Sequence, residues 1–236
     1  MHDEVLEHVR STFHLRQGHG SVNQSRGAGQ LFKGDFSSST TAGAEFAGSR
    51  LGLGVMHDLD GEVVSVYGTT WRIPVSGIPV EVMPTEGIAF GIAAHGGREH
   101  RIEIPVGSDM IGILDVIDAY LAKSHVDHER VICAIEVDGS FTDLVLRTEA
   151  PPTFANETLG EILENETRFE FDEWRGSLVG FRFPDETDGQ TIPGLHFHAI
   201  SHDRVSGGHV REVVVNKVDA KVWVDELHPV HGIRKR

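Results

Sequence analysis

The chain has 236 residues, of which 39% are hydrophobic and 24% are charged. These proportions are those of a soluble globular protein with a sizeable core, and they exclude an intrinsically disordered chain. The formal net charge of −15 argues against non-specific binding to nucleic acid or to anionic lipid.

Cysteine usage and apolar runs narrow the protein class further. The single cysteine, Cys133, excludes a disulfide framework and any zinc or iron–sulfur site built from cysteines. No segment approaches the roughly 18 consecutive apolar residues of a membrane span, and the N-terminal sequence is too polar and acidic for a signal peptide. We therefore expect a cytoplasmic protein whose partners are neither nucleic acid nor membrane.

The N-terminal part of the chain is predicted to contain a short helix, a linker and then a run of short strands. Apolar residues recur at helical spacing over about 3–14, whereas 18–41 is rich in Gly, Ser, Gln and Asn. Residues 1–28 are therefore expected to form a helix and a linker. From about 51 to 94, short apolar runs alternate with Gly, Pro and Thr, which is typical of a β-meander.

A longer helix and a hairpin are expected next. Ser108 has the position of an N-cap, because apolar residues follow it at helical spacing up to Lys123. The runs RVICAIEV (130–137) and FTDLVLRT (141–148) predict two strands. Between them lies Asp138-Gly139, a dipeptide that strongly favours a tight hairpin turn.

A short helix near 157–166 separates this half of the chain from a second β-rich stretch over 177–224. Strands outnumber helices and gather in two sets, which predicts an α+β fold with two packed sheets. We place an N-terminal half at 29–155 and a C-terminal half at 156–236. The Gly-Leu-Gly at 52–54 lacks the third glycine and the following helix of a dinucleotide fingerprint, so we expect no dinucleotide there.

Four of the chain's 15 histidines lie in the segment GLHFHAISHDRVSGGHV (194–210). Successive side chains of a strand point to opposite faces, so His196 and His198 share one face while the apolar residues beside them face a core. Taken alone, such a pair is more often an ordinary polar surface of a strand.

His209 favours a metal site over that interpretation. The intervening residues include turn formers, so the chain can return and place His209 beside the pair. Three adjacent imidazoles repel one another when protonated, and a cation that keeps them neutral stabilises the cluster. A set of three histidines leaves one coordination position open, as in catalytic zinc, although imidazole also suits iron, nickel, copper and manganese. His202 in the loop, and His228 and His231 near the C-terminus, are interpreted as surface residues.

The segment VGFRFPDETDGQTIPGLHFHAISHDRVSGGHV (179–210) resembles the C-terminal signature of the α-acetolactate decarboxylase family. In that family, Gly-x-His-x-His and Gly-Gly-His segments supply three metal-binding histidines. LGLGVMHDLDGEVVSVYG (51–68) resembles the family's Gly-x-Gly-Thr … Leu-Asp-Gly-Glu segment, and AIEVDGSFTDLVLRTEAPP (134–152) resembles its Ile-x-Gly-x-Phe … Arg-Ser-Val-Pro segment. The matches occur in the same order and cover most of residues 30–217.

The resemblance implies metal ligation by His196, His198 and His209, with an acidic active-site residue at Glu62 and a cationic one at Arg147. It implies a two-domain α+β fold in a homodimer, with a mixed sheet in the N-terminal half and the metal in the C-terminal β-structure. The implied activity is decarboxylation of 2-acetolactate, a 2-hydroxy-3-oxo acid, to acetoin and CO₂. A divalent metal such as Zn²⁺ would be the electron sink, and no organic cofactor is needed. By residue type alone, Glu62 could be a turn carboxylate and Arg147 an exposed strand-end cation.

Two departures from the family pattern leave other functions open. Val55 stands where the family usually has a threonine. The family's C-terminal glutamate has no assigned counterpart, and Asp225 and Glu226 are the acidic residues near the end. The alternatives are a relative that acts on another hydroxy-oxo acid, or a non-catalytic module that binds metal or ligand. A cupin-like metalloenzyme is disfavoured, because His202 and Asp203 occupy the positions of the glutamate that cupins need.

Overall fold

A computed structural model describes residues 22–25, 29–124, 131–154, 157–184 and 194–226. The helix expected over 3–14 lies outside these residues. Within the described part of the chain, the fold is mostly β-sheet with few helices. No helix in this part is both long enough and apolar enough to span a membrane.

The first sheet has seven strands in the order β1-β7-β3-β4-β5-β6, with β2 also paired to β7. Its strands are β1 (Val22–Gln24), β2 (Thr40–Thr41), β3 (Leu51–Met56), β4 (Glu62–Val66), β5 (Thr69–Ile73), β6 (Val80–Glu81) and β7 (Gly87–Ala94). Consecutive strands from β3 to β6 are neighbours, which confirms the β-meander, and β7 returns to the free side of β3. Every strand pair described in this sheet is antiparallel, so the implied mixed sheet is wrong. Short connections within the meander permit only antiparallel neighbours.

The second sheet has five strands in the order β11-β10-β9-β12-β8. Its strands are β8 (Glu99–Ile102), β9 (Val131–Thr148), β10 (Thr167–Phe183), β11 (Gly194–Ser201) and β12 (Gly207–Glu226). β11 also pairs with β12, so four strands close into a ring at one end of this sheet. Closure brings residues of β9, β11 and β12 onto one concave face.

The chain passes from the first sheet to the second between β7 and β8, not near residue 155. β9 precedes residue 155 in the sequence, yet it lies between β10 and β12, which both follow residue 155. Strands from both 29–155 and 156–236 therefore build the second sheet. The reason is physical: β9 is buried along most of its length and gains a pairing partner on each edge.

Asp138-Gly139 does not form the expected hairpin turn, because β9 continues through it from Val131 to Thr148. At Gly139 a Cβ atom would lie 2.1 Å from the carbonyl oxygen of Lys217 in β12. The glycine therefore permits a close approach of β9 and β12 and does not form a turn, and glycine within a strand commonly has this role. Pairing on both edges of β9 outweighs the local turn preference of the dipeptide.

The two helices predicted in the middle of the chain are present, whereas the predicted linker contains regular structure. The segment 18–41, expected to be a linker, contains β1, β2 and the helix α2 (Gly29–Phe32). Helix α4 (Met110–Lys123) ends as predicted, but its N-cap is Asp109, whose side chain accepts a hydrogen bond from the Gly112 amide at 2.8 Å. Helix α5 (Leu159–Glu164) confirms the predicted short helix. Two further short helices precede β4: α3 (Ala42–Phe46) and the 3-10 helix η2 (His57–Leu59).

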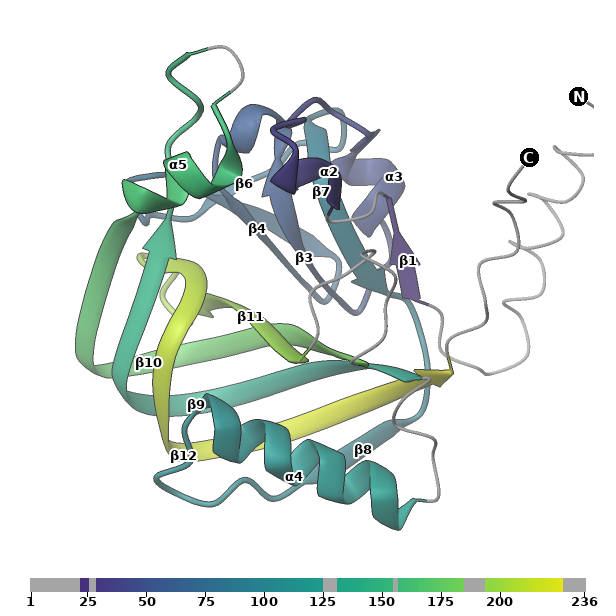
Figure 1. Cartoon of the computed structure of the whole chain (residues 1–236). Helices are drawn as coiled ribbons and strands as arrows, with labels where there is room; N and C mark the ends of the chain where they lie inside the picture. The colour runs from purple at the N-terminus through teal and green to yellow at the C-terminus, as the bar shows by residue number, and fades with distance from the viewer. Residues whose placement is uncertain (1–21, 26–28, 125–130, 155–156, 185–193, 227–236) are drawn as a thin grey trace, which may run out of the picture.

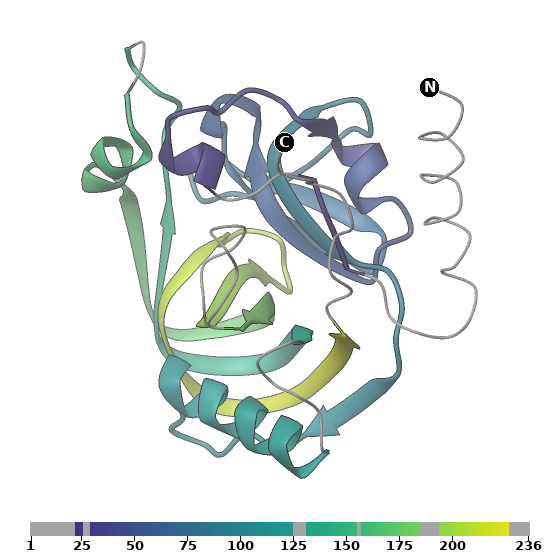
Figure 2. The same cartoon turned by 45° about the vertical axis from the view of Figure 1, so that its right-hand side comes forward.

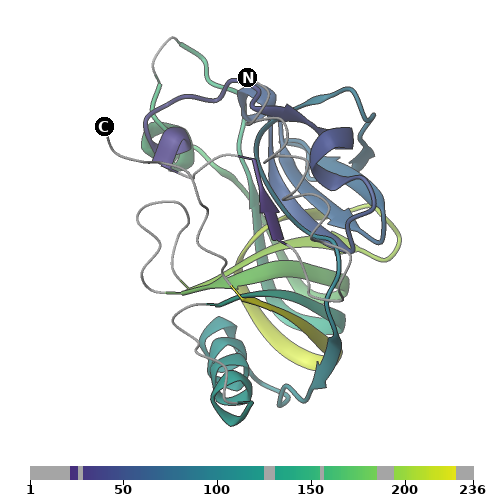
Figure 3. The same cartoon turned by 90° about the vertical axis from the view of Figure 1, so that its right-hand side faces the viewer.

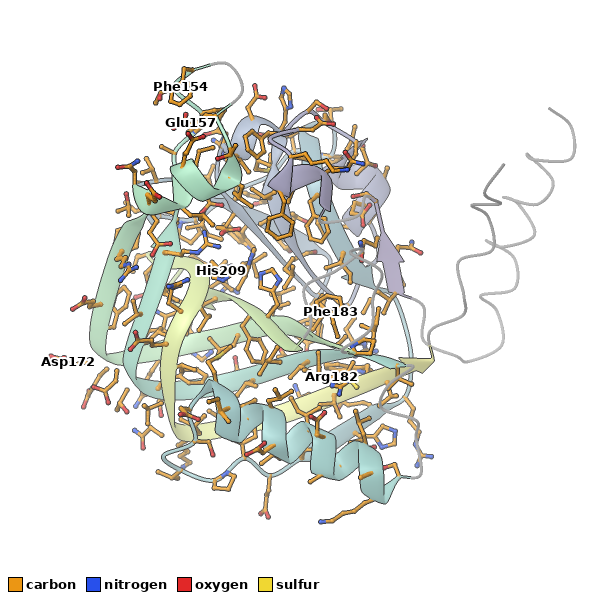
Figure 4. The ribbon with its side chains drawn as sticks, in the orientation of Figure 1. Phe154, Glu157, Asp172, Arg182, Phe183 and His209 are labelled. Carbon is orange, nitrogen blue, oxygen red and sulfur yellow. The ribbon has the colours of Figure 1, made fainter. Side chains whose placement is uncertain are left out.

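The two sheets and α4 form three layers, with the second sheet in the middle (Figure 1 and Figure 2). One hydrophobic core lies between the sheets, and another lies between the second sheet and α4. Successive side chains of β10 point to opposite faces of the second sheet. Phe183 packs in the core between the sheets, whereas Arg182 points toward α4 and donates a hydrogen bond to Asp118 at 2.9 Å (Figure 4). Helices α2 and α5 lie side by side at one end of the sheets (Figure 3).

Candidate functional site

Strand register places three polar residues in a row across the second sheet. His198 of β11 is paired with His209 of β12, which in turn is paired with Arg147 of β9. Directly paired residues of antiparallel strands point to the same face. His196, two residues before His198, shares that face as predicted, and Phe197 between them is buried in the core toward α4.

The imidazoles of His196, His198 and His209, here called the histidine cluster, converge on one point. The Nε2 atom of His196 lies 3.2 Å from Nε2 of His198 and 3.1 Å from Nδ1 of His209. Metal–nitrogen bonds of 2.0–2.1 Å in a tetrahedral site would separate two ligand nitrogens by about 3.3 Å. The nitrogens are therefore spaced as ligands of one ion, and the cluster could hold a metal ion.

The protonation of the histidine cluster suits metal binding. Burial lowers the pKa of His198 to about 3, and it lowers the pKa values of His196 and His209 well below their ordinary 6.5. All three imidazoles are therefore neutral near pH 7 and keep a nitrogen lone pair. The Nδ1 atom of His198 lies 2.8 Å from the carbonyl oxygen of Val63. This bond needs a proton on Nδ1 and so leaves Nε2 free to bind a metal, as outer-shell partners of metal-binding histidines commonly do.

Glu62 reaches the histidine cluster from the first sheet, at the beginning of β4. Its carboxylate oxygens lie 3.3 Å from Nε2 of His198 and 3.8 Å from Nδ1 of His209. Val55 of β3 is paired with Glu62 in the sheet, so the two residues lie side by side at the cavity. The site is thus shared between the sheets: the imidazoles come from the second sheet and the carboxylate from the first.

Arg147 is surrounded by three carboxyl groups. Its Nη1 atom lies 3.3 Å from Glu62 and 2.6 Å from Glu149, and its Nε atom lies 3.4 Å from Glu166. All four side chains are at most 10% exposed, so solvent screens these contacts only weakly. Glu166 also contacts the more exposed cations Arg168 and Arg211. Glu62 and Glu149 therefore share Arg147 as their cation, whereas Glu166 has two further cations beside it.

The sequence analysis missed Glu149 and Glu166. The sequence could have indicated Glu149, because it lies two residues after Arg147. In an extended chain the two side chains therefore point to the same face. Burial raises the pKa of Glu149 to about 9, with a further contribution from the charge of Glu62. Burial also raises the pKa of Glu62. Glu166 has no such signal, since the strand pairing of β9 with β10 brings it close.

A cavity of about 90 Å³ opens in front of the histidine cluster, with room for a small organic acid. Its polar side carries the cluster, Glu62, Arg147 and Glu149. The rest of the lining is apolar and comes from both sheets and from helices α2 and α5. The apolar lining residues are Leu31, Phe32, Gly54, Val55, Leu59, Phe90, Leu159 and Phe183. Figure 4 shows His209 and Phe183 between the two sheets.

Comparison with known proteins decides the family. The family model described as alpha-acetolactate decarboxylase matches residues 23–231. The chain belongs to the alpha-acetolactate decarboxylase family. Decarboxylases are carboxy-lyases, so the chain belongs to a family of enzymes.

Individual members of the alpha-acetolactate decarboxylase family are distant in sequence. The protein of that name from Klebsiella aerogenes is 28% identical over 182 residues, which are 76% of this chain and 67% of the relative. The one from Methanosarcina mazei is 27% identical over 176 residues, 75% of this chain and 59% of the relative. The chain thus matches about three-fifths to two-thirds of the length of these relatives.

A solved structure of the alpha-acetolactate decarboxylase family shows the same fold. The crystal structure of the Bacillus subtilis strain 168 enzyme superposes with a TM-score of 0.74. The identity is 24%, and the superposition covers 87% of this chain and 85% of that chain. At this identity the likeness concerns the fold alone.

The remaining residues named from the sequence do not join the histidine cluster. His202 is half-exposed in the β11–β12 turn and lies 2.8 Å from Asp138, which agrees with its interpretation as a surface residue. Glu226 ends β12 and is paired with Val131, at the far end of the strand from His209. His228 and His231 lie outside the described residues. Among the described residues, the acidic side chains that line the cavity are Glu62 and Glu149, and Glu149 directly follows β9.

Proposed function

We propose that the protein decarboxylates 2-acetolactate to acetoin and CO₂, using a Zn²⁺ ion held by His196, His198 and His209. The observation that carries this proposal is the convergence of three neutral imidazoles with Glu62 and Arg147 on one cavity. Family membership supports the reaction class. The cavity supports a small acid as the substrate, because its polar side matches carboxylate and oxygen groups and its apolar side matches alkyl groups.

Zinc is the proposed metal because three histidines with an open position are a catalytic zinc set. Iron, nickel, copper and manganese remain alternatives that imidazole also binds. A bound divalent metal would supply Lewis-acid stabilisation of the negative charge that develops when CO₂ leaves the substrate. The chain's own part is to keep the imidazoles neutral by burial and to fix His198 through its bond to Val63.

Arg147 and Glu62 would act directly on the substrate. A guanidinium has five N–H donors, and the contacts with carboxyl groups described above involve Nη1 and Nε. Arg147 can therefore bind the substrate carboxylate while its neighbours hold its orientation. Glu62, beside the histidine cluster, is placed to move a proton to and from the substrate oxygens. The surrounding apolar side chains exclude water, which strengthens each of these interactions.

The test combines metal analysis with turnover. Purified protein is analysed for bound metal, loaded with Zn²⁺ and incubated with 2-acetolactate, and acetoin and CO₂ are measured. His196→Ala should lose metal and product, whereas His202→Ala, a matched histidine substitution outside the cluster, should keep both. If the wild type holds metal but forms no product, the non-catalytic alternative is correct. If His196→Ala turns over like the wild type, the proposed metal site is refuted.

Another hydroxy-oxo acid is the second candidate substrate, and Val55 is the observation that favours it. Its side chain lines the cavity beside Glu62 where the family usually has a hydroxyl. A 2-hydroxy-3-oxo acid with a longer alkyl group would gain from this apolar contact. Steady-state kinetics with 2-acetolactate and with its longer-chain analogues test this, because the preferred substrate has the higher kcat/KM.

Two further parts of the proposal rest on the family resemblance. We propose that the protein is a homodimer, which light scattering on the purified chain can check. We also propose that it works in the cytoplasm, which fractionation of the source cells can check.

A further inference from the structure

We propose that Glu149 is a further catalytic residue, whose carboxyl group delivers the proton that replaces CO₂ on the substrate carbon. This inference rests on the proposed function, because it assigns a role within that reaction. The residues carried over from the family resemblance do not include Glu149. It stands here on its position in the cavity, its contacts and the proton balance of the reaction.

The side chain of Glu149 faces the cavity. Glu149 lines the cavity together with Arg147 and the histidine cluster. Its side chain is only 4% exposed, and its Oε2 atom lies 2.6 Å from Nη1 of Arg147. Because Arg147 is the proposed carboxylate-binding group, the carboxyl of Glu149 would lie beside the carbon that loses CO₂.

The reaction needs one proton for each turnover. The bond between the substrate carbon and its carboxylate breaks, CO₂ leaves, and the electron pair stays as an enediolate. A C–H bond then forms at the same carbon, and the enediolate becomes the hydroxyketone. Glu149 would give up its proton in this step and regain one from water, so the net reaction consumes one proton from solvent. No oxidant, reductant or co-reactant is required.

Glu149 is better placed for this step than the other two carboxyl groups. Glu62 lies against the imidazoles of His198 and His209, so it faces the substrate oxygens at the metal. Glu166 contacts Arg147 through Nε and is paired with the exposed cation Arg168, and it is not a cavity-lining residue.

The contact between Glu149 and Glu62 supports the assignment. Glu149 and Glu62 are neighbouring buried carboxyl groups, and both contact Nη1 of Arg147, at 2.6 and 3.3 Å. Burial, helped by the charge of Glu62, outweighs the charge of Arg147 and raises the pKa of Glu149 to about 9. Two adjacent buried carboxyl groups share a proton for the same reason in other acid–base sites.

The test compares Glu149→Gln with Glu166→Gln in the metal-loaded full chain, acting on 2-acetolactate. Both variants remove a carboxyl group that contacts Arg147, but only Glu149 faces the cavity. Glu149→Gln should lower kcat by about a hundredfold to ten-thousandfold with a small change in KM, the usual effect of losing a general acid. The handedness of the acetoin should also be lost in part, because water would then protonate the planar intermediate from either face. Glu166→Gln should raise KM at most several-fold and keep the handedness.

A third variant separates chemistry from structure. Glu149→Asp keeps an acidic group but withdraws it by one methylene, so its kcat should lie between those of the wild type and Glu149→Gln, with handedness kept. If Glu149→Gln fails to fold or to bind metal, the comparison of Glu149→Asp with the wild type carries the test. Wild-type kcat and handedness in Glu149→Gln, or equal losses in Glu149→Gln and Glu166→Gln, would overturn the inference. A wild type that forms no acetoin would instead refute the proposed function itself.

Discussion

Gly208 offers a direct test of how the second sheet builds the site. It precedes His209 in β12, has a φ of 147°, and packs against β9 so closely that a Cβ would lie 2.6 Å from the carbonyl oxygen of Arg147. Gly208→Ala must therefore push apart the two strands that carry a cluster histidine and the site's arginine. Both the stability of the sheet and the metal site should suffer.

The magnitude of the effect at Gly208 follows from two costs. A side chain held at an unfavourable backbone conformation costs about 1–3 kcal/mol. An extra methyl group forced into close packing costs about 1–3 kcal/mol more. The sum, roughly 2–6 kcal/mol, should lower the Tm of a chain of this length by roughly 4–24 °C, at about 2–4 °C for each kcal/mol. Displacement of His209 should also weaken metal binding by about 10–100-fold, as for losses of supporting contacts around a metal.

Thermal melting of the metal-free protein and zinc titration measure the two effects. Gly48→Ala is the matched control, because Gly48 has a φ of 73° but no atom within 4 Å of the added Cβ. It should cost only about 1–2 kcal/mol of backbone strain and leave metal binding unchanged. If Gly208→Ala were no worse than Gly48→Ala in both assays, the close approach of β12 to β9 would not be what positions His209.

Three further predictions concern the cavity. Val55→Thr restores a hydroxyl beside Glu62 and should raise kcat/KM for 2-acetolactate by roughly twofold to tenfold, the value of one hydrogen bond; steady-state kinetics measure this, and a lower value would favour another substrate. Arg147→Lys removes the planar donor set and should lower kcat/KM at least about tenfold, mainly through KM, so a wild-type KM would contradict its role. The histidine cluster has pKa values below the ordinary 6.5 when folded, so the unfolded chain binds more protons below that pH. The histidine contribution to the free energy of unfolding of the metal-free protein should therefore fall as pH drops from 6.5 toward 3, whereas the raised pKa of Glu149 acts in the opposite direction down to its ordinary 4.5. Thermal melts of the wild type and of His198→Ala at several pH values isolate the histidine contribution; an identical pH dependence in both would count against a buried, neutral imidazole.

Local patterns predicted those parts of the fold that depend on local forces. The meander from β3 to β6 and the helices α4 and α5 follow from residue periodicity and capping signals within each segment. The failed hairpin at Asp138-Gly139 shows where such reasoning ends. A turn dipeptide expresses a preference of a few residues, whereas β9 gains a partner strand on each edge and a core on each face.

The histidine cluster could be predicted because its three members lie close in the sequence. Strand alternation aligns His196 with His198, and one hairpin returns His209 to their side. The position of Glu62 could be inferred only through the family resemblance, because it comes from the other sheet. Glu166 could not be predicted, since its place beside Arg147 depends on the register between β9 and β10 over a connection that includes α5.

The division of the site between two sheets has a consequence for both stability and specificity. The imidazoles, Arg147 and Glu149 belong to the second sheet and its extension, whereas Glu62 and Val55 belong to the first. The hydrophobic core between the sheets therefore sets the distance from Glu62 to the histidine cluster, so loss of packing there should loosen the site before the chain unfolds. The cavity takes its histidines, Arg147 and Glu149 from one sheet and Val55 and Phe90 from the other, so under the proposed function a bound acid would contact both sheets. A change of apolar side chain at Val55 would then alter the preferred substrate without moving the histidine cluster, because Val55 belongs to the first sheet and the imidazoles belong to the second.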